Sequence, residues 1–343
     1  MRLLRVAALS LGAMSPAFAQ DGALEPKEWT VPWERTRPRD PIMDPAGRVW
    51  FVGQQGNYIA YLDPKSGQFK QYSIDPGTNP HNINLDERGG VWYTGNRNSR
   101  IVQLIPETGE LKTIMMPDPT VRDPHTMIWG KDGIAWFTAQ GSQRIGRFDR
   151  NTGEIKLWRP HKDSPTDSIS NPYGVVLATD GTPYFNLFQS PKIATIDPKT
   201  LEYKEFVHPD ARMRARRIAI TSDNQVWFGD YRGFINHLDP KTGKFEEWPM
   251  PSGAASQPYA HAQDDQDSIW IVETGVHPNK LVAFDTKTKD WVANITIPSL
   301  TAQGRNTIRH MTYNKATREL WFGTDAGTIG KINVPKDIRK LTP

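Results

Sequence analysis

Residues 80–115 read PHNINLDERGGVWYTGNRNSRIVQLIPETGELKTIM and contain four short strand-like runs separated by turn-forming residues. The runs are His81–Leu85, Val91–Thr94, Ile101–Ile105 and Leu111–Met115. They are rich in apolar and β-branched residues, and Gly, Asn and Pro stand between them, as is typical of strands joined by tight turns. Four such strands form a small sheet that cannot bury both of its faces alone, so the unit predicts neighbours of the same kind.

The same unit recurs along the chain, marked by an aromatic pair in its second strand. The spacings between successive pairs are 42, 44, 48, 43, 43 and 51 residues. The seven pairs begin at Trp50, Trp92, Trp136, Tyr184, Trp227, Trp270 and Trp321. A period in the forties with four strands per unit is the signature of propeller blades. We therefore predict an all-β fold, a seven-bladed β-propeller with four-stranded antiparallel blades. An open β-solenoid or two sandwiches are the structural alternatives.

The last unit has only three of its four strands, because the chain stops soon after the run Thr328–Val334. A spare strand, Glu28–Val31, stands before the first unit. We predict that this N-terminal strand completes the seventh blade and closes the ring. Closure would remove the two sheet edges that otherwise invite aggregation.

The first nineteen residues have the pattern of a signal peptide: a charged start, an apolar stretch and small residues at a cleavage site. We expect residues 1–19 to be removed, and residues 20–343 to form one propeller domain, periplasmic or secreted, with no membrane span and monomeric. The whole chain has a formal charge of +4, of which Arg2 and Arg5 supply two, so +2 remains after cleavage. This charge does not favour a nucleic-acid partner.

The chain has no Cys, which excludes disulfides, thiol chemistry, cysteine zinc sites and c-type haem attachment. It also has no phosphate loop, nucleophile elbow or zincin motif, so neither haem nor a nucleotide is expected. Three histidines, His161, His208 and His277, lie in loop-like segments, and we expect them to be exposed to solvent.

A belt of large polar residues appears at one register position of the repeat. Counting eleven residues back from each aromatic anchor, with one more in the last unit, gives Arg39, His81, His125, Tyr173, Arg216, Tyr259 and Arg309. The innermost strand of a propeller blade lines the central channel, so we predict that these seven side chains (the belt) meet near one mouth of it. Such positions are polar in many wet channels. Arg, His and Tyr together nevertheless favour an anionic or carbonyl-rich ligand.

Two acids occupy another shared position, the third residue after each anchor. They are Asp230 and Glu273, on neighbouring units. Together they could hold a hard divalent cation such as Mg²⁺, or Glu273 could act as a base beside His261, which strand alternation places on the same face as Tyr259. The alternative is an ion pair between either acid and a belt arginine.

The repeated entries Pro80-His81, Pro124-His125, Pro172-Tyr173 and Pro258-Tyr259 resemble those of the virginiamycin B (streptogramin B) lyases, as do Trp136-Phe137-Thr138, Arg144–Phe148 and Thr152–Ile155. The resemblance covers nearly the whole mature chain. It implies a seven-bladed propeller. It also implies elimination across the ester of a cyclic depsipeptide, with a His as base and Mg²⁺ held by Glu and His side chains. Residue by residue, His125 with Asp123 matches the family's acid-Pro-His entry, and Glu273 matches its Trp-Phe-Thr-Glu acid.

Two functions follow as hypotheses. The first is a carbon–oxygen lyase acting on a small cyclic ester, lactone or peptide, with Mg²⁺ near Asp230 and Glu273 and with His261 or His125 as base. The second is a non-catalytic propeller that binds a small ligand or a periplasmic protein partner through the belt. A lactonase of the gluconolactonase type would need a metal cage of acids and Asn, which the belt does not resemble.

Overall fold

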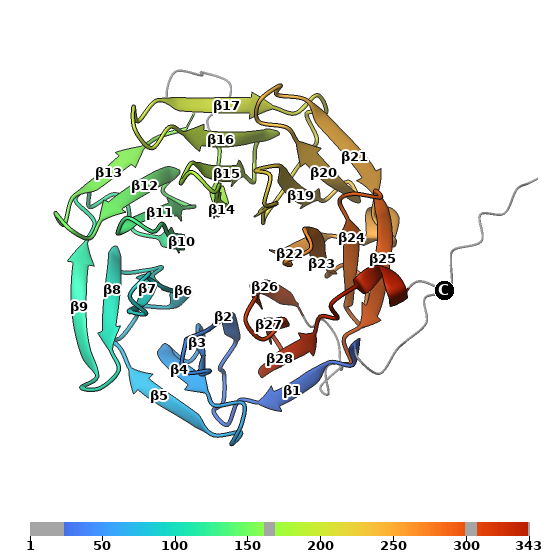
Figure 1. The fold of residues 1–343 in the computed structure, drawn as a ribbon. Helices are drawn as coiled ribbons and strands as arrows, with labels where there is room; N and C mark the ends of the chain where they lie inside the picture. The colour runs from blue at the N-terminus through green and yellow to red at the C-terminus, as the bar shows by residue number, and fades with distance from the viewer. Residues whose placement is uncertain (1–23, 161–168, 299–306, 342–343) are drawn as a thin grey trace, which may run out of the picture.

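The computed structural model describes residues 24–160, 169–298 and 307–341. In this part of the chain, the strands form seven four-stranded antiparallel sheets arranged as blades around a central axis (Figure 1). This arrangement confirms the predicted propeller. Apart from the strands there are two short 3₁₀ turns, Gly253–Ala255 and Ile338–Leu341.

Each blade runs from the axis outward in chain order. Blade 1 holds β2 (Pro38–Met43), β3 (Val49–Gly53), β4 (Tyr58–Leu62) and β5 (Phe69–Ser73). Blade 2 holds β6 (Pro80–Leu85), β7 (Val91–Gly95), β8 (Arg100–Ile105) and β9 (Glu110–Met115). Blade 3 holds β10 (Pro124–Trp129), β11 (Ile134–Ala139), β12 (Arg144–Asp149) and β13 (Ile155–Trp158). Blade 4 holds β14 (Pro172–Leu177), β15 (Pro183–Leu187), β16 (Lys192–Ile196) and β17 (Tyr203–Val207).

The later blades follow the same order. Blade 5 holds β18 (Ala219–Ile220), β19 (Val226–Asp230), β20 (Phe234–Leu238) and β21 (Phe245–Pro249). Blade 6 holds β22 (Pro258–Gln263), β23 (Ser268–Glu273), β24 (Lys280–Asp285) and β25 (Asp290–Thr296). Blade 7 holds β26 (Ile308–Asn314), β27 (Glu319–Thr324), β28 (Thr328–Asn333) and, outermost, β1 (Lys27–Thr30).

The N-terminal strand closes the ring as predicted. β1 pairs antiparallel with β28, and Trp29 lies opposite Ile329 in the register. The indole of Trp29 stacks on that of Trp321, with ring centroids 5.6 Å apart. Blade 7 therefore combines the two ends of the described chain, and each of the seven described blades has four strands (Figure 1).

The apolar core of the described residues lies between blades. Seven clusters of buried side chains each join two neighbouring blades, including the pair formed by blades 7 and 1. The aromatic anchors lie in these clusters. In three blades the anchor indole also donates a hydrogen bond to an aspartate six residues earlier, such as Trp50 to Asp44 at 2.8 Å. The same aspartate accepts backbone N–H groups of the intervening turn, so one residue joins turn and core.

A β-bulge recurs in the inner strand of every described blade. In blade 1, Arg39 pairs with Val52 whereas Ile42 pairs with Trp50, so the inner strand contains one extra residue. The same shift occurs in the other six blades; in blade 5 it lies between the bridge at Ala215 and β18. A bulge interrupts strict alternation and re-aims side chains. As a result, a belt residue and the residue after it can both point toward the axis.

No helix among the described residues is long and apolar enough to cross a membrane. The predicted signal peptide, residues 1–19, lies outside the described residues.

Candidate binding site in the central channel

The belt residues meet at the axis although they lie far apart in the chain. The rings of His81 and His125 are 3.4 Å apart between centroids, and His125 lies 4.3 Å from Tyr173. The hydroxyls of Tyr173 and Tyr259 are hydrogen-bonded to each other. Arg216 donates weakly to both hydroxyls, at 3.4 Å and 3.3 Å. Equal positions in successive repeats therefore do converge.

Arg216 lies in an aromatic box. Its guanidinium carbon is 4.3 Å from the ring centroid of Phe188, 4.9 Å from Tyr259, 5.3 Å from Tyr173 and 5.6 Å from Tyr231. These distances are typical of cation–π contacts. Among the described residues no carboxylate forms an ion pair with Arg216, and its Nε has no hydrogen-bond partner. The charge of Arg216 is therefore held by π faces and phenols alone.

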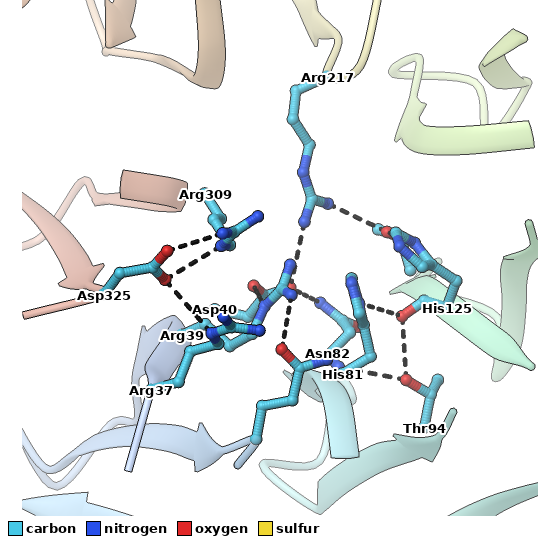
Figure 2. Close-up of polar contacts among 12 residues, drawn as sticks. Arg37, Arg39, Asp40, His81, Asn82, Thr94, His125, Arg217, Arg309 and Asp325 are labelled. Carbon is cyan, nitrogen blue, oxygen red and sulfur yellow. Dashed lines mark hydrogen bonds and ion pairs between the residues drawn. The ribbon is translucent and has the colours of Figure 1, made fainter. Parts of the chain in front are cut away.

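The other belt arginines have acidic partners. Arg309 donates to Asp325 through Nε and Nη2, at 3.0 Å and 2.7 Å, and Arg37 approaches the same carboxylate at 3.6 Å. Arg39 is buried, donates to Asp40 and Gln54, and keeps an unpartnered Nη2. Figure 2 shows these pairs around the axis. The guanidiniums outnumber the carboxylates in this region, so the belt carries a positive surplus.

The positive surplus of the belt influences the pKa values of its two tyrosines. Burial alone would raise the pKa of Tyr259, but the nearby Arg39, Arg216, Arg217 and Arg309 outweigh it and lower the pKa below its ordinary value, to about 8. The pKa of Tyr173 moves the other way, to about 12, because burial and the neighbouring Tyr259 oppose its ionisation. Tyr259 is thus the phenol of the belt that ionises more readily.

The histidines of the channel are neutral at physiological pH. Burial, followed by the influence of nearby arginines, lowers the pKa values of His81 and His125 well below the ordinary value. Burial likewise lowers the pKa of His261 to about 4 and that of His310 to about 3. The fixed positive charge of the channel therefore comes from arginine.

A buried ion pair that the sequence did not point to crosses the channel. Arg217 of blade 5 extends its Nη2 to 3.5 Å from Asp40 of blade 1, and its Nη1 donates to Thr126 of blade 3 at 3.0 Å (Figure 2). Asn82 donates to the same Asp40 carboxylate at 2.9 Å. We call this group, Asp40, Asn82, Thr126 and Arg217, the cross-channel tie. All four residues are buried.

The tie depends on close backbone approach between blades 4 and 5. A Cβ at Gly174 would lie 3.1 Å from Cα of Arg217 and 3.0 Å from the carbonyl oxygen of Arg216, so a side chain there would need these neighbours to shift.

Burial alone would raise the pKa of Asp40, but the influence of His310, Arg39 and Arg217 and the Asn82 hydrogen bond hold it well below its usual range. Asp40 is therefore an ionised, buried carboxylate.

The two acids three residues after their aromatic anchors, Asp230 and Glu273, each contact nearby residues. Asp230 forms an ion pair with Arg232 at 2.7 Å and accepts from Asn236 at 2.7 Å. Glu273 accepts from the N–H and the hydroxyl of Ser252, and burial raises its pKa. Neither carboxylate pairs with Arg216 or Arg309, which were the predicted ion-pair alternatives.

His261 is held by the backbone on both sides. Its Nε2 accepts from the N–H of Gly229 at 2.7 Å, and its Nδ1 lies 2.8 Å from the carbonyl oxygen of Tyr259. Among the contacts of the described residues, His261 and Glu273 have no partner in common. The structure therefore does not bring these two predicted catalytic side chains onto a shared atom.

The residues that the resemblance implies for Mg²⁺ do not form a fitting donor set as placed here. In the described part of the chain there is no group of three or more His, Asp or Glu side chains that could share a cation. The oxygens of Asp230 and Glu273 are directed to Arg232, Asn236 and Ser252. Magnesium binding stays a prediction.

The remaining predictions concern three histidines that were expected to be exposed and Asp123, which matches the family's acid-Pro-His entry. His208 is buried and its Nε2 lies 3.1 Å from Asn236, so the expectation of exposure was wrong for it: the loop is packed against blade 5. His277 is exposed as expected, and His161 lies outside the described residues. Asp123 accepts from the backbone N–H of Gly141 and Ser142, and so fastens a loop.

On the side of the tie away from the belt lies a cavity of about 490 Å³, which we call the lower cavity. Its lining includes Arg217, His261 and His310 and excludes all seven belt residues. The channel thus consists of a packed belt, a buried tie and an open cavity.

Comparison with known proteins gives one family and one fold. The chain matches the model of the virginiamycin B lyase family over residues 24–332. Among solved structures, selenomethionine-substituted virginiamycin B lyase from Staphylococcus aureus is 22% identical with a TM-score of 0.79, covering 91% of this chain and 100% of that one. A streptogramin B lyase is 23% identical with a TM-score of 0.78, covering 91% and 98%.

A catalytically inactive histidine-to-alanine variant of the S. aureus enzyme, with quinupristin, is 21% identical with a TM-score of 0.79, covering 91% and 100% of the two chains. At these identities the likeness shows the fold. No curated protein sequence matches the chain significantly.

Proposed function

The chain belongs to the virginiamycin B lyase family, and from this premise we propose that it is a lyase-like propeller that binds a small anionic or carbonyl-rich ligand at the belt. The proposal rests on the surroundings of Arg216. The residue is partly exposed, and its guanidinium is surrounded by four aromatic rings and has no acidic partner among the described residues. Guanidinium groups bind carboxylates and carbonyl-rich groups through charge-assisted, often bidentate hydrogen bonds.

Arg309 supports the same ligand class from blade 7. Its side chain is 25% exposed, and its guanidinium lies 5.8 Å from the ring centroid of Tyr259, the same ring that Arg216 contacts at 4.9 Å. A ligand that reaches Arg216 therefore also meets the positive field of Arg309. Tyr259 and Tyr173 add hydroxyls that can donate to a ligand oxygen.

The test is calorimetric binding with quinupristin and a panel of small carboxylates, using Arg216→Gln. We expect the variant to bind the best probe about 10- to 100-fold more weakly, because a charge-assisted hydrogen bond contributes about 1.5–3 kcal/mol. The matched control is Arg212→Gln on blade 5, whose side chain is 82% exposed and away from the belt. Equal affinity of Arg216→Gln and the parent protein would rule out the belt as the site.

A second candidate is a carbon–oxygen lyase that uses the same belt, and family membership favours it. His125 supports this function better than His261 does. It lies in the belt beside Tyr173, whereas both ring nitrogens of His261 are engaged by backbone groups. Burial keeps the His125 ring neutral, and a neutral imidazole can accept a proton next to a carbonyl. The arginines would stabilise the negative charge that develops on the carbonyl oxygen as that proton leaves. The departing ester oxygen takes the electron pair of the broken C–O bond.

Mass spectrometry of quinupristin distinguishes the outcomes. Elimination opens a ring without adding atoms, so the product keeps the mass of the substrate but changes its retention, whereas hydrolysis adds one water. A lyase predicts the first result, with a large loss of rate in His125→Ala. Binding without any product would support the non-catalytic propeller, and a thermal shift on Mg²⁺ titration would support the magnesium site at Asp230 and Glu273.

We also propose export to the periplasm or the exterior, on the strength of the signal-like pattern in residues 1–19. Cell fractionation with N-terminal sequencing tests this directly. A mature protein that starts at Gln20 outside the cytoplasm is the expected result, and an intact Met1 in the cytoplasm would contradict it.

A further inference from the structure

The lower cavity has no part in the proposed function, and its chemistry points to a ligand of its own. We propose that it is a second binding site, for a small organic monoanion: a carboxylate attached to an apolar body. Its volume of about 490 Å³ lies in the range of small-molecule sites.

The lining carries positive charge and no acid. Arg217 lies at the inner end and Lys315, which is exposed, at the outer end, and the described lining residues include no Asp or Glu. Behind the lining, Arg217 shares the single carboxylate of Asp40 with Arg39, so one positive charge remains uncompensated there. Since His261 and His310 are neutral, the surplus at the inner end is about one charge; the exposed Lys315 adds a second charge that solvent screens, so the inner end matches a monoanion.

Hydrogen-bonding capacity is also left over at the inner end. Arg217 has five N–H donors, and its Nη1 and Nη2 each contact one partner, Thr126 and Asp40. A ligand carboxylate that pairs with a remaining N–H of Arg217 would form a charge-assisted hydrogen bond. His261, Asn82 and Thr126, in contrast, already have partners within the protein.

The wall between the two ends carries both apolar and uncharged polar side chains. It includes Met43, Ile128, Val176 and Ile220, with the amides of Asn84 and Gln263 between them. A second charge at this wall would lose its hydration without gaining a charged partner, whereas a hydrocarbon body can contact the apolar side chains. A short aliphatic or aromatic monocarboxylate fits these features.

The site is separate from the belt. The tie lies between them, and the belt residues do not line the cavity. The two sites can therefore be disturbed one at a time, which keeps a failure of this inference apart from a failure of the proposed function.

The experiment is calorimetric titration with hexanoate and with its neutral analogue hexanamide. Hexanoate should bind, and hexanamide should bind at least ~10-fold more weakly, as expected for the loss of a charge-assisted contact. Val176→Trp and, independently, Ile220→Phe should fill the cavity and abolish binding. The control Val207→Trp places the same bulk on β17, where the side chain is 61% exposed, and should bind normally.

Arg216→Gln and Lys315→Gln separate the sites further. Arg216→Gln should leave hexanoate binding unchanged, and Lys315→Gln should weaken it only ~2- to 5-fold, because an exposed charge contributes little. The inference is overturned if hexanoate shows no heat at millimolar concentration, if the folded filling variants still bind it, or if Arg216→Gln alone removes the binding.

Discussion

The belt and the cross-channel tie are built from consecutive residues of the same strands, yet they are opposite in character. The belt side chains pack ring on ring, with Arg216 and Arg309 still partly exposed. The residues that follow them form a buried network in which Asp40 and Thr126 accept hydrogen bonds from Asn82 and Arg217. The repeated bulge therefore produces two layers from neighbouring positions of the repeat: one can bind a ligand, and the other joins blades 1, 2, 3 and 5.

The largest expected effect is acid destabilisation of both layers. His81, His125, His261 and His310 have folded pKa values below the ordinary value, so in acid the unfolded chain binds protons that the folded chain does not. Stability should therefore be flat between about pH 7 and pH 8 and fall as the pH drops from about 6.5 toward 4, by up to ~1.4 kcal/mol per pH unit for each histidine. Urea unfolding at a series of pH values measures this slope. A stability that is constant from pH 7 to 5 would contradict the burial of neutral histidines.

The next prediction compares how much one aspartate of each layer, Asp40 in the tie and Asp325 beside the belt, contributes to stability. Asp40→Ala removes the carboxylate shared by Arg39 and Arg217 and should cost about 3–5 kcal/mol, since it leaves buried charges uncompensated. Asp325→Ala removes the partner of the partly exposed Arg309 and should cost at most about 1 kcal/mol. Chemical denaturation compares the two. Equal costs would mean that the tie is no more structural than the belt.

The smallest effect concerns the positive field of the belt. One phenol should ionise near pH 8, seen as tyrosinate absorbance, because the arginines around Tyr259 lower its pKa. Tyr259→Phe should remove this step, and Arg216→Gln should move it to higher pH. If every tyrosine of the folded protein titrated above pH 10, the belt would not carry the charge assigned to it.

The repeat predicted the fold and the belt because both depend on period. The aromatic anchors mark the second strand of each described blade, and the residues eleven before them reach the axis. The tie was missed because strict alternation would turn Asp40 and Arg217 away from the axis. A signal was present: the residue after the belt position is polar in Asp40, Asn82, Thr126, Arg217 and His310, where an alternating strand would place an apolar residue against the next blade.

The contacts of Asp230 and Glu273 were less predictable, because an equal position in the repeat does not determine what a side chain contacts. Asp230 finds Arg232 two residues on, and Glu273 finds Ser252 in the loop before β22. Both partners belong to loops that differ between blades, so the repeat carries no information about them. The roles predicted for His261, Glu273 and a magnesium ion at the two acids remain predictions.

The most direct test of the two-layer channel is a double-mutant cycle between Arg217 and Asp40, which are 177 residues apart in the chain. The unfolding free energies of the parent protein, Arg217→Met, Asp40→Asn and the double variant would be compared. Direct contact across the channel predicts a coupling of at least ~1 kcal/mol, with the double variant more stable than the sum of the single losses implies. Additivity within ~0.5 kcal/mol would show that no tie crosses the axis.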